Sequence, residues 1–233
     1  MNISSCVLWL DASQITGLNN NDLIVTWLDM SGLGNNASTS QGSGGGNPIY
    51  ITGGINALPS VRFDGVGDVL ETIGSFSMPY TVLVVARWNG GDNDRLITAS
   101  TEWTLGWHQF GDYNDFFVDA STAVFNGAGG ANLNPLLQAA RSASPWTEYY
   151  IDGSLITSNG AVAGNIGNLR VGGFLGTDLF CADGDVSEIV IYNRVLTDDE
   201  HGQVGFYLQD RYGITGSYTG APPAQAGMLI QIR

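Results

Sequence analysis

The chain has 233 residues, 33 of them glycine, and only 13% are charged, a composition typical of one all-β domain with many short strands and tight turns. The formal net charge is -14 and the sequence contains no lysine, so we expect its surface to repel nucleic acids and anionic membranes. The excess of carboxylates could hold Ca²⁺, or it could only keep the protein soluble.

The N-terminal residues 1–13 show neither the basic region nor the long apolar run of a signal peptide, and no stretch of the sequence reaches membrane-spanning length. We therefore expect a soluble protein on a virion surface or outside the cell. Its leader has been removed, or it leaves its cell by another route, such as assembly into a virus particle released by lysis.

The first half of the chain contains short apolar runs rich in β-branched and aromatic residues. Residues 7–12 and 23–30 are predicted strands, and residues 59–72 are predicted to form two short strands around a glycine-rich turn. Residues 31–54 are polar and glycine-rich, so they are predicted to form a long surface loop. The nearly continuous apolar run 80–88 predicts a central strand.

The second half begins with RLITAS, TLGWHQF and DFFVDA, which follow one another at the spacing of an antiparallel sandwich. Residues 146–157 predict a β-hairpin, because Asp152 and Gly153 tolerate the positive φ values of a type I′ turn. NLRVGGF and DVSEIVIYN are further predicted strands.

One helix is predicted near the C-terminus. Thr197 and Glu200 have the spacing of a capping box, and Gly213 can end the helix in the left-handed conformation. Val204, Leu208 and Tyr212 recur every fourth residue and form the stripe that packs on the sandwich.

The composition changes after Ile214, so we predict a domain of residues 1–214 followed by a linker and C-terminal arm, residues 215–233. The arm ends in the strand-like sequence MLIQIR. Such a strand could pair with an edge of its own sheet or with a neighbouring subunit, and both alternatives stay open.

Several stretches together resemble the laminin G-like or concanavalin A-like jelly-roll domains of bacterial surface proteins and phage structural proteins. They are VLWLDAS, VTWLDMSGLGNNAS, PSVRFDGVGDVLET, YTVLVVAR and GDVSEIVIYNRVLTDDEHGQVGFYLQDRYGI, which span roughly residues 5–214. The resemblance implies an all-β, two-sheet antiparallel jelly-roll sandwich (concanavalin A-like) with one C-terminal helix. It does not imply a reaction.

Asp183, Asp185 and Glu188 resemble the Glu-x-Asp-x-x-Glu strand with which glucanases of the laminarinase and lichenase type, which share this fold, cleave sugars. Asp183 is one methylene shorter than the glutamate at the first position of that pattern. In a regular strand Glu188 would also point away from the two aspartates, so the constellation needs a bulge that nothing in the sequence demands. A glycoside hydrolase using these residues is therefore the alternative, and we predict that the chain is not an enzyme.

Other candidate sites are weaker. His108 and His201 lie far apart and have no neighbours at metal-ligand or catalytic spacing. Two turns are rich in Asp and Asn and could hold Ca²⁺ or could serve only as turn formers. Their candidate ligands are Asp92, Asp94, Asp112 and Asp115. No other cofactor is predicted.

Trp103, Leu105 and Trp107 share one face of a predicted strand, and Tyr113 follows in a loop. Their rings could stack on a sugar, or the two tryptophans could pack in the core beside Leu105. Cys6 and Cys181 could form one disulfide or remain two buried thiols.

These observations lead to a functional hypothesis. We expect a non-catalytic jelly-roll protein on the outside of a phage particle or cell, acting in decoration or attachment and recognising a glycan. Its partners would be other virion or surface proteins, reached through the arm 221–233, and a homo-oligomer is also open. The rival within binding proteins is a secreted bacterial lectin-like module.

Overall fold

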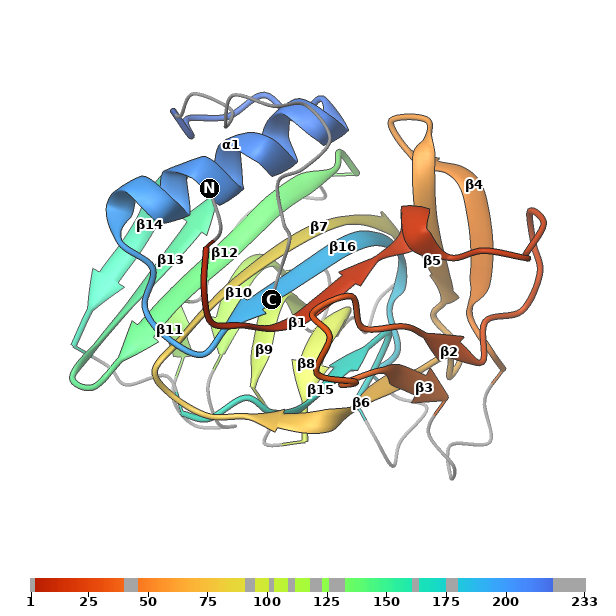
Figure 1. The fold of residues 1–233 in the computed structure, drawn as a ribbon, viewed down its shortest axis with the longest axis horizontal. Helices are drawn as coiled ribbons and strands as arrows, with labels where there is room; N and C mark the ends of the chain where they lie inside the picture. The colour runs from red at the N-terminus through yellow and green to blue at the C-terminus, as the bar shows by residue number, and fades with distance from the viewer. Residues whose placement is uncertain are drawn as a thin grey trace.

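Two antiparallel β-sheets stack face to face, and one α-helix lies across the outer face of the first sheet (Figure 1). The computed structural model describes residues 3–39, 46–90, 95–100, 103–108, 112–117, 123–125, 133–160, 164–174 and 180–219. This architecture confirms the predicted all-β sandwich with one C-terminal helix.

Each sheet has eight strands within the described residues. The first sheet has the order β14-β13-β12-β7-β16-β5-β4, and β1 also pairs with β16. Its strands are β1 (Cys6–Asp11), β4 (Ile49–Ile55), β5 (Leu58–Asp64), β7 (Tyr80–Gly90), β12 (Leu136–Ala143), β13 (Trp146–Ile151), β14 (Ser154–Asn159) and β16 (Asp183–Tyr192). A short 3-10 helix, η1 (Ala12–Gln14), follows β1.

The second sheet has the order β11-β10-β9-β8-β15-β6-β3-β2. Its strands are β2 (Thr26–Trp27), β3 (Ala37–Thr39), β6 (Leu70–Phe76), β8 (Ile97–Ala99), β9 (Thr104–His108), β10 (Asp112–Phe117), β11 (Ala123–Phe125) and β15 (Gly167–Val171).

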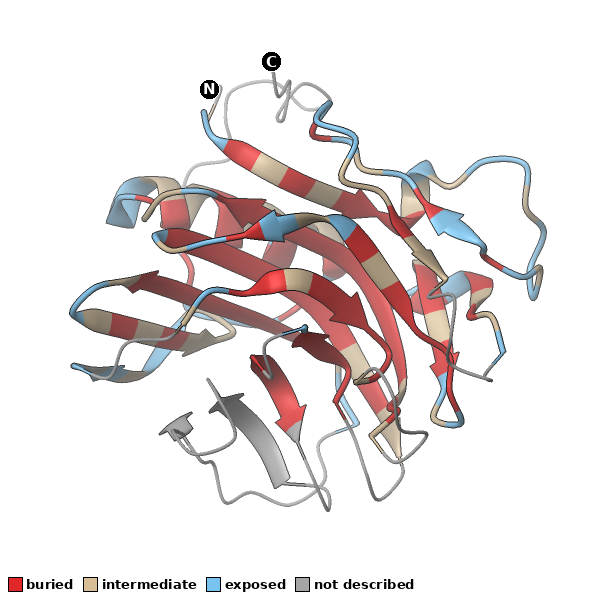
Figure 2. Cartoon of the chain, turned by 90° about the horizontal axis from the view of Figure 1, so that it is seen from below, coloured by how far each residue is buried: buried red, intermediate tan, exposed pale blue. Residues whose placement is uncertain are grey.

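Strand β7 is apolar along nearly its whole length because both of its faces are covered. Val82 and Val84 point into the core between the sheets, whereas Leu83 and Val85 belong to a second core beneath the helix. The same division applies to the neighbouring β16. Figure 2 shows the resulting continuous buried zone along the central strands, which confirms that residues 80–88 form a central strand.

The helix α1 spans Asp198–Tyr212 and is capped at both ends as the sequence predicts. Thr197 and Glu200 form the reciprocal capping box, and Gly213 has φ 59°, the left-handed conformation that ends the helix. Val204 and Leu208 are buried against the first sheet. The hairpin between β13 and β14 also forms as predicted, with φ values of 48° at Asp152 and 82° at Gly153.

The prediction that residues 31–54 form one long surface loop is wrong in two places. Ala37–Thr39 forms β3, which pairs with β6, and Ile49–Ile55 forms β4, which pairs with β5. Both strands are held by backbone hydrogen bonds to partners farther along the chain, so their own polar and glycine-rich sequence carries little strand signal.

The segment after the helix is packed onto the domain as far as Thr219. The Tyr218 ring is buried, its hydroxyl lies 3.0 Å from Nε2 of His201, and its backbone N–H donates to Gln209. Burial lowers the pKa of His201 to about 3, so this histidine is neutral near pH 7. The remaining residues of the predicted arm lie outside the described part of the chain.

Replacing Gly205 by alanine should displace Tyr218. A Cβ at Gly205 would lie 2.4 Å from Cγ of the Tyr218 ring, so we expect Gly205→Ala to lower the free energy of unfolding by about 1–3 kcal/mol. Gly202→Ala on the same helix is the control, because its Cβ would meet only the backbone oxygen of Thr219 at 3.2 Å. Urea unfolding of both variants tests this, and equal stabilities would contradict the contact.

Candidate functional site

The carboxylates of β16 do not lie as a regular strand would place them. The register of β16 shifts between Val186 and Glu188, at the point where its partner changes from β5 to β1. This bulge brings Glu188 onto the outer face of the sheet that Asp185 also occupies, since their cross-strand neighbours Val85 and Arg87 both point outward. The expectation that Glu188 points away from Asp185 is therefore wrong. The irregularity lies at the point where β16 changes its partner on the opposite edge.

Asp185 is fully buried and is held by two arginines. Nε of Arg62 donates to one carboxylate oxygen at 2.7 Å, and Arg87 pairs with the other. Arg87 also donates from Nε to the side chain of Asn89. Because its charge is neutralised on both sides, Asp185 has no free face to offer a substrate.

Glu188 belongs to a separate buried network beneath the C-terminal end of the helix. Its carboxylate accepts from Nε1 of Trp9 at 2.8 Å and from the hydroxyl of Tyr212 at 2.9 Å. Arg211 lies 3.2 Å from the same carboxylate and 3.0 Å from the buried Asp11. Burial raises the pKa of Glu188 to about 7, and the charge of Asp11 adds to this while Arg211 opposes it.

Both networks are buried, so neither Asp185 nor Glu188 faces a space that is open to a sugar. Asp185 and Glu188 are each 0% exposed and bonded to different arginines, and Asp183 lies beyond a second register shift, opposite Asp64 of β5. Retaining glycosidases need two carboxyl groups facing one another across an accessible sugar. The arrangement does not favour hydrolysis by Asp183, Asp185 and Glu188.

Trp103 and Trp107 lie in the core between the two sheets. Their side chains are 0% and 1% exposed and pack beside Leu105, and Nε1 of Trp103 donates to the hydroxyl of Tyr80 at 2.8 Å. The structure thus shows core packing, and neither indole reaches a ligand at the surface. The side chain of Tyr113 lies outside the described residues.

The proposed calcium ligands fall where the structure gives no side chains. Asp92 and Asp94 lie outside the described residues, and only the backbone of Asp112 and Asp115 is described, in β10. Elsewhere in the described chain, no group of three His, Cys, Asp or Glu residues could hold a metal ion. Cys6 and Cys181 are buried free thiols and form no disulfide, and burial raises the pKa of Cys6 to about 12.

One cavity lies at an open end of the sandwich, and we call it the end pocket. It has a volume of about 480 Å³, within the range of small-molecule sites. Its lining comes from β1, from residues before β3, from the stretch between the end of β6 and the start of β7, and from the end of β16, and none of it is charged. The residues are Val7, Leu33, Asn35, Gly74, Ser75, Phe76, Ser77, Met78, Tyr80, Ile191, Tyr192 and Asn193.

The end pocket was missed by the sequence analysis, because its lining residues come from four separate segments. Asn35 is held in place by its Nδ2, which donates to the carbonyl oxygen of Val7 at 2.8 Å. Its side chain lies directly against Gly74, where a Cβ would approach Oδ1 to 2.3 Å. The only local signal was the hydroxyl-rich turn GSFSMP, which by itself indicates a turn and not a site.

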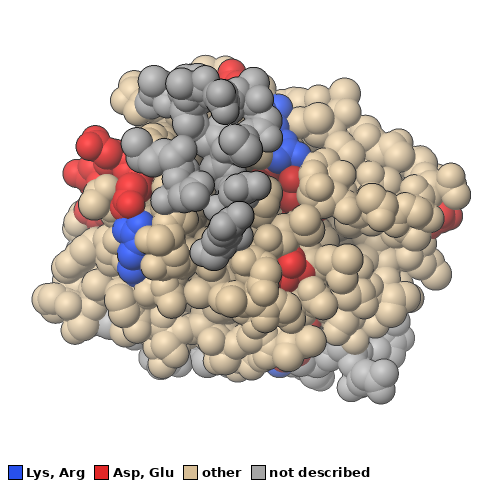
Figure 3. Space-filling view, viewed as in Figure 1, with Lys and Arg blue, Asp and Glu red and all other residues tan. Residues whose placement is uncertain are grey.

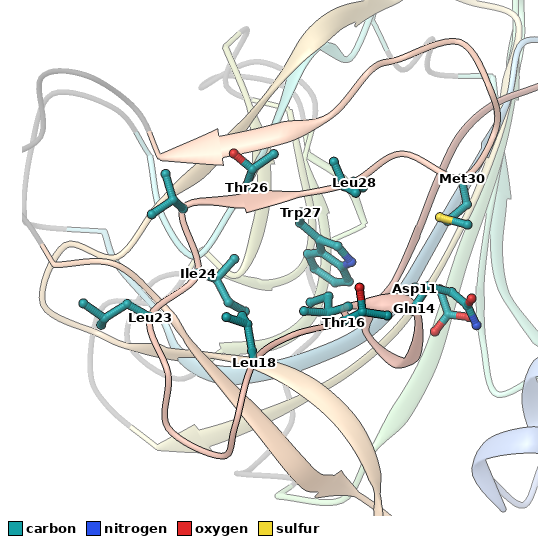
Figure 4. Close-up of a pocket in the computed structure, with 12 residues that line it drawn as sticks. Asp11, Gln14, Thr16, Leu18, Leu23, Ile24, Thr26, Trp27, Leu28 and Met30 are labelled. Atoms are coloured by element: carbon teal, nitrogen blue, oxygen red, sulfur yellow. The ribbon is translucent and has the colours of Figure 1, made fainter.

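A second cavity, which we call the loop pocket, lies between residues 14–18 and 23–30 (Figure 4). Its volume is about 280 Å³ and its walls are mainly aliphatic. Trp27 and Ile24 are buried at its base, and Asp11 and Gln14 lie at one end.

Most positive charges of the described chain are paired with carboxylates of the same chain. Six of its seven arginines form ion pairs with Asp or Glu, and the guanidinium of Arg95 lies 5.0 Å and 4.9 Å from the rings of Phe174 and Phe180. Figure 3 shows an acidic patch at the N-terminal end of the helix, whose first turn carries Asp198, Asp199 and Glu200. Most of the face seen there is uncharged.

The fold is similar to that of solved proteins that act on or bind carbohydrates. The sialidase of Trypanosoma rangeli, in complex with sialic acid, aligns with a TM-score of 0.64 and 16% identity over 90% of this chain. The chain spans 34% of the sialidase, about a third of its length. Domain 4 of a GH43 extracellular arabinanase from Geobacillus stearothermophilus, in complex with arabinotriose, aligns with a TM-score of 0.61 and 15% identity over 83% of this chain and 95% of that domain.

A GH54 α-L-arabinofuranosidase is similar as well, with a TM-score of 0.60 and 16% identity over 88% of this chain and 54% of that enzyme. No protein-family model and no curated protein sequence matches the chain. At these identities the likeness shows a shared two-sheet β-sandwich and no more.

The prediction that the chain is not an enzyme is overturned by these comparisons. The prediction rested on the short side chain of Asp183 and the expected direction of Glu188, but the similar structures belong to a sialidase, an arabinanase and an arabinofuranosidase. The fold itself is shared by glycoside hydrolases, so it gives no ground for excluding a reaction, and it assigns none.

None of the described helices is long and apolar enough to cross a membrane.

The buried Glu188 should make stability depend on pH in a defined window. Because its pKa rises from 4.5 to about 7 on folding, the folded protein holds the proton more tightly than the unfolded chain. Its contribution to stability is full below pH 4.5 and is lost as the pH rises through about 7. As the pH rises from 4.5 to 8, we expect the free energy of unfolding to fall less in Glu188→Gln than in the wild type.

Urea unfolding at several pH values measures this difference. Glu200→Gln is the matched control, because Arg194 holds the pKa of Glu200 down at about 2 and its contribution to stability is lost only as the pH falls below 4.5. A Glu188→Gln profile parallel to the wild type between pH 4.5 and 8 would show that Glu188 does not titrate in this window.

Proposed function

We propose that this chain is a carbohydrate-binding β-sandwich domain that receives an uncharged sugar in the end pocket. The observation that carries the proposal is the pocket itself. It has a volume of about 480 Å³ and twelve lining residues without a charge, in a chain whose net charge is -14.

The lining suits the chemistry of a sugar ring. Ser75, Ser77, Asn35 and Asn193 supply hydroxyl and amide groups that can both donate to and accept from sugar hydroxyls. Leu33 and Met78 supply the apolar surface on which the C–H face of a ring can rest.

The charge distribution favours a neutral ligand over an acidic one. An anionic sugar would need an available arginine or lysine, but the chain has no lysine and six of the seven described arginines already pair with carboxylates. The arabinanase domain that shares the fold was solved with arabinotriose, a neutral oligosaccharide, and this supports the same class of ligand.

The biological setting of this binding is a finer proposal. The stretches VLWLDAS, PSVRFDGVGDVLET and GDVSEIVIYNRVLTDDE resemble laminin G-like domains, and this resemblance supports a surface component. We propose decoration or attachment on a phage particle, with a secreted bacterial lectin-like module as the alternative. Immunodetection on purified virions against culture supernatant distinguishes the two settings.

A binding experiment with a matched pair of variants tests the pocket. Arabinotriose and other neutral oligosaccharides are titrated by isothermal calorimetry into the wild type, Ser77→Trp and Ser158→Trp. We expect Ser77→Trp to weaken binding at least tenfold, because the indole would fill the mouth of the end pocket.

Ser158→Trp places the same bulky ring on the exposed edge strand β14, three strands away from β7, and should bind like the wild type. Equal affinities of the two tryptophan variants would remove the end pocket from the proposal. The absence of binding to any neutral glycan on an array would overturn the function.

A further inference from the structure

We propose that the loop pocket is a second ligand site, which binds a small uncharged molecule with an apolar body and one hydrogen-bond acceptor. This site is separate from the end pocket and does not depend on the proposed sugar binding. Two independent features of the pocket support it, one of its walls and one of its floor.

The walls of the loop pocket expose apolar side chains of a kind that a folded protein usually buries. Ten large apolar side chains are exposed among the described residues, and four of them line this one cavity, namely Leu23, Val25, Leu28 and Met30. Leu23 and Leu28 are each 59% exposed. Concentrated apolar surface around a concavity is the usual mark of a binding site.

The floor holds a polar group without a partner. The Trp27 side chain is 0% exposed, and its Nε1–H has no hydrogen-bond acceptor. Figure 4 shows the indole among the apolar side chains, with its nitrogen turned toward the end of the pocket where Asp11 and Gln14 lie. Leaving a buried donor unpaired costs free energy, so a ligand that brings an acceptor to this donor would bind more tightly.

The cavity limits the size and the charge of the ligand. Its volume of about 280 Å³ is nearly twice the roughly 150 Å³ of an engineered apolar cavity that takes up benzene, so it suits a molecule of about ten non-hydrogen atoms. Asp11 at the polar end is already paired with Arg211, and it would repel an anion. A carbonyl oxygen or a neutral ring nitrogen is the acceptor that fits.

A sugar fits this pocket less well than the end pocket. Gln14, Thr16 and Thr26 are the polar uncharged residues of its lining, whereas each ring hydroxyl of a sugar needs a partner when it is buried. An apolar body with a single acceptor leaves no polar group of the ligand unsatisfied.

Quinoline and naphthalene form the matched pair of probes, because they have the same bicyclic shape and only quinoline has a ring nitrogen that accepts a hydrogen bond. Each is titrated into ¹⁵N-labelled protein while the six tryptophan indole N–H resonances are followed by NMR. We expect saturable binding of quinoline with a downfield shift of the Trp27 indole resonance, and a smaller shift with naphthalene.

Trp27→Phe removes the donor and keeps an aromatic floor. It should weaken quinoline binding roughly threefold to tenfold, the size of one net hydrogen bond, and should change naphthalene binding by less than about twofold. Leu28→Gln at the rim should weaken both probes, whereas Leu155→Gln, at a residue 52% exposed on β14, should weaken neither.

If Trp27→Phe fails to fold, the wild-type resonances and the two leucine variants still decide the question. The proposal is overturned if neither probe saturates, if quinoline shifts another indole in place of Trp27, or if Leu28→Gln and Leu155→Gln bind alike. It is also overturned if sedimentation shows a wild-type dimer that Leu28→Gln dissociates, because a second copy would then cover these leucines.

Discussion

The structure depends on how the strand β16 (Asp183–Tyr192) changes partners. On one side it pairs with β7 along its whole length, and on the other it pairs first with β5 and then with β1. The bulge at this change turns both Asp185 and Glu188 toward the outer face of the sheet. Two buried carboxylates on one face require compensating charges, and the fold supplies them from β5, β7 and the helix.

The pairing of arginines with carboxylates also determines the charge of the molecular surface. Arg62 and Arg87 are committed to Asp185, and Arg211 is committed to Glu188 and Asp11. The remaining described ion pairs also tie arginines to carboxylates of the same chain. With no lysine in the sequence, few positive charges are left to attract an anionic ligand. The end pocket is correspondingly uncharged, and the walls of the loop pocket are mainly apolar.

The two pockets illustrate how one β-sandwich can offer several sites. The end pocket lies where the sheets separate at an open end of the sandwich, and the loop pocket lies under the connection that leads from β1 to β2. The end pocket uses the ends of the central strands, with Tyr80 of β7 and Ile191 and Tyr192 of β16, whereas the lining of the loop pocket comes from residues 11–30. Proteins with this fold include glycoside hydrolases, so its function has to be argued from such sites and not from the fold.

Local signals in the sequence determined the helix, the hairpin and the central strand. The capping pair Thr197 and Glu200, the turn at Asp152 and Gly153, and the apolar run of β7 each act over a few residues, so their neighbours in the chain suffice. The tertiary structure alone decided the rest, because it depends on contacts between distant segments. β3 and β4 exist through their partners β6 and β5, and the bulge before Glu188 lies where β16 passes from one partner strand to another. The core position of Trp103 and Trp107 depends on the opposite sheet, and the two pockets on loops that only folding brings together.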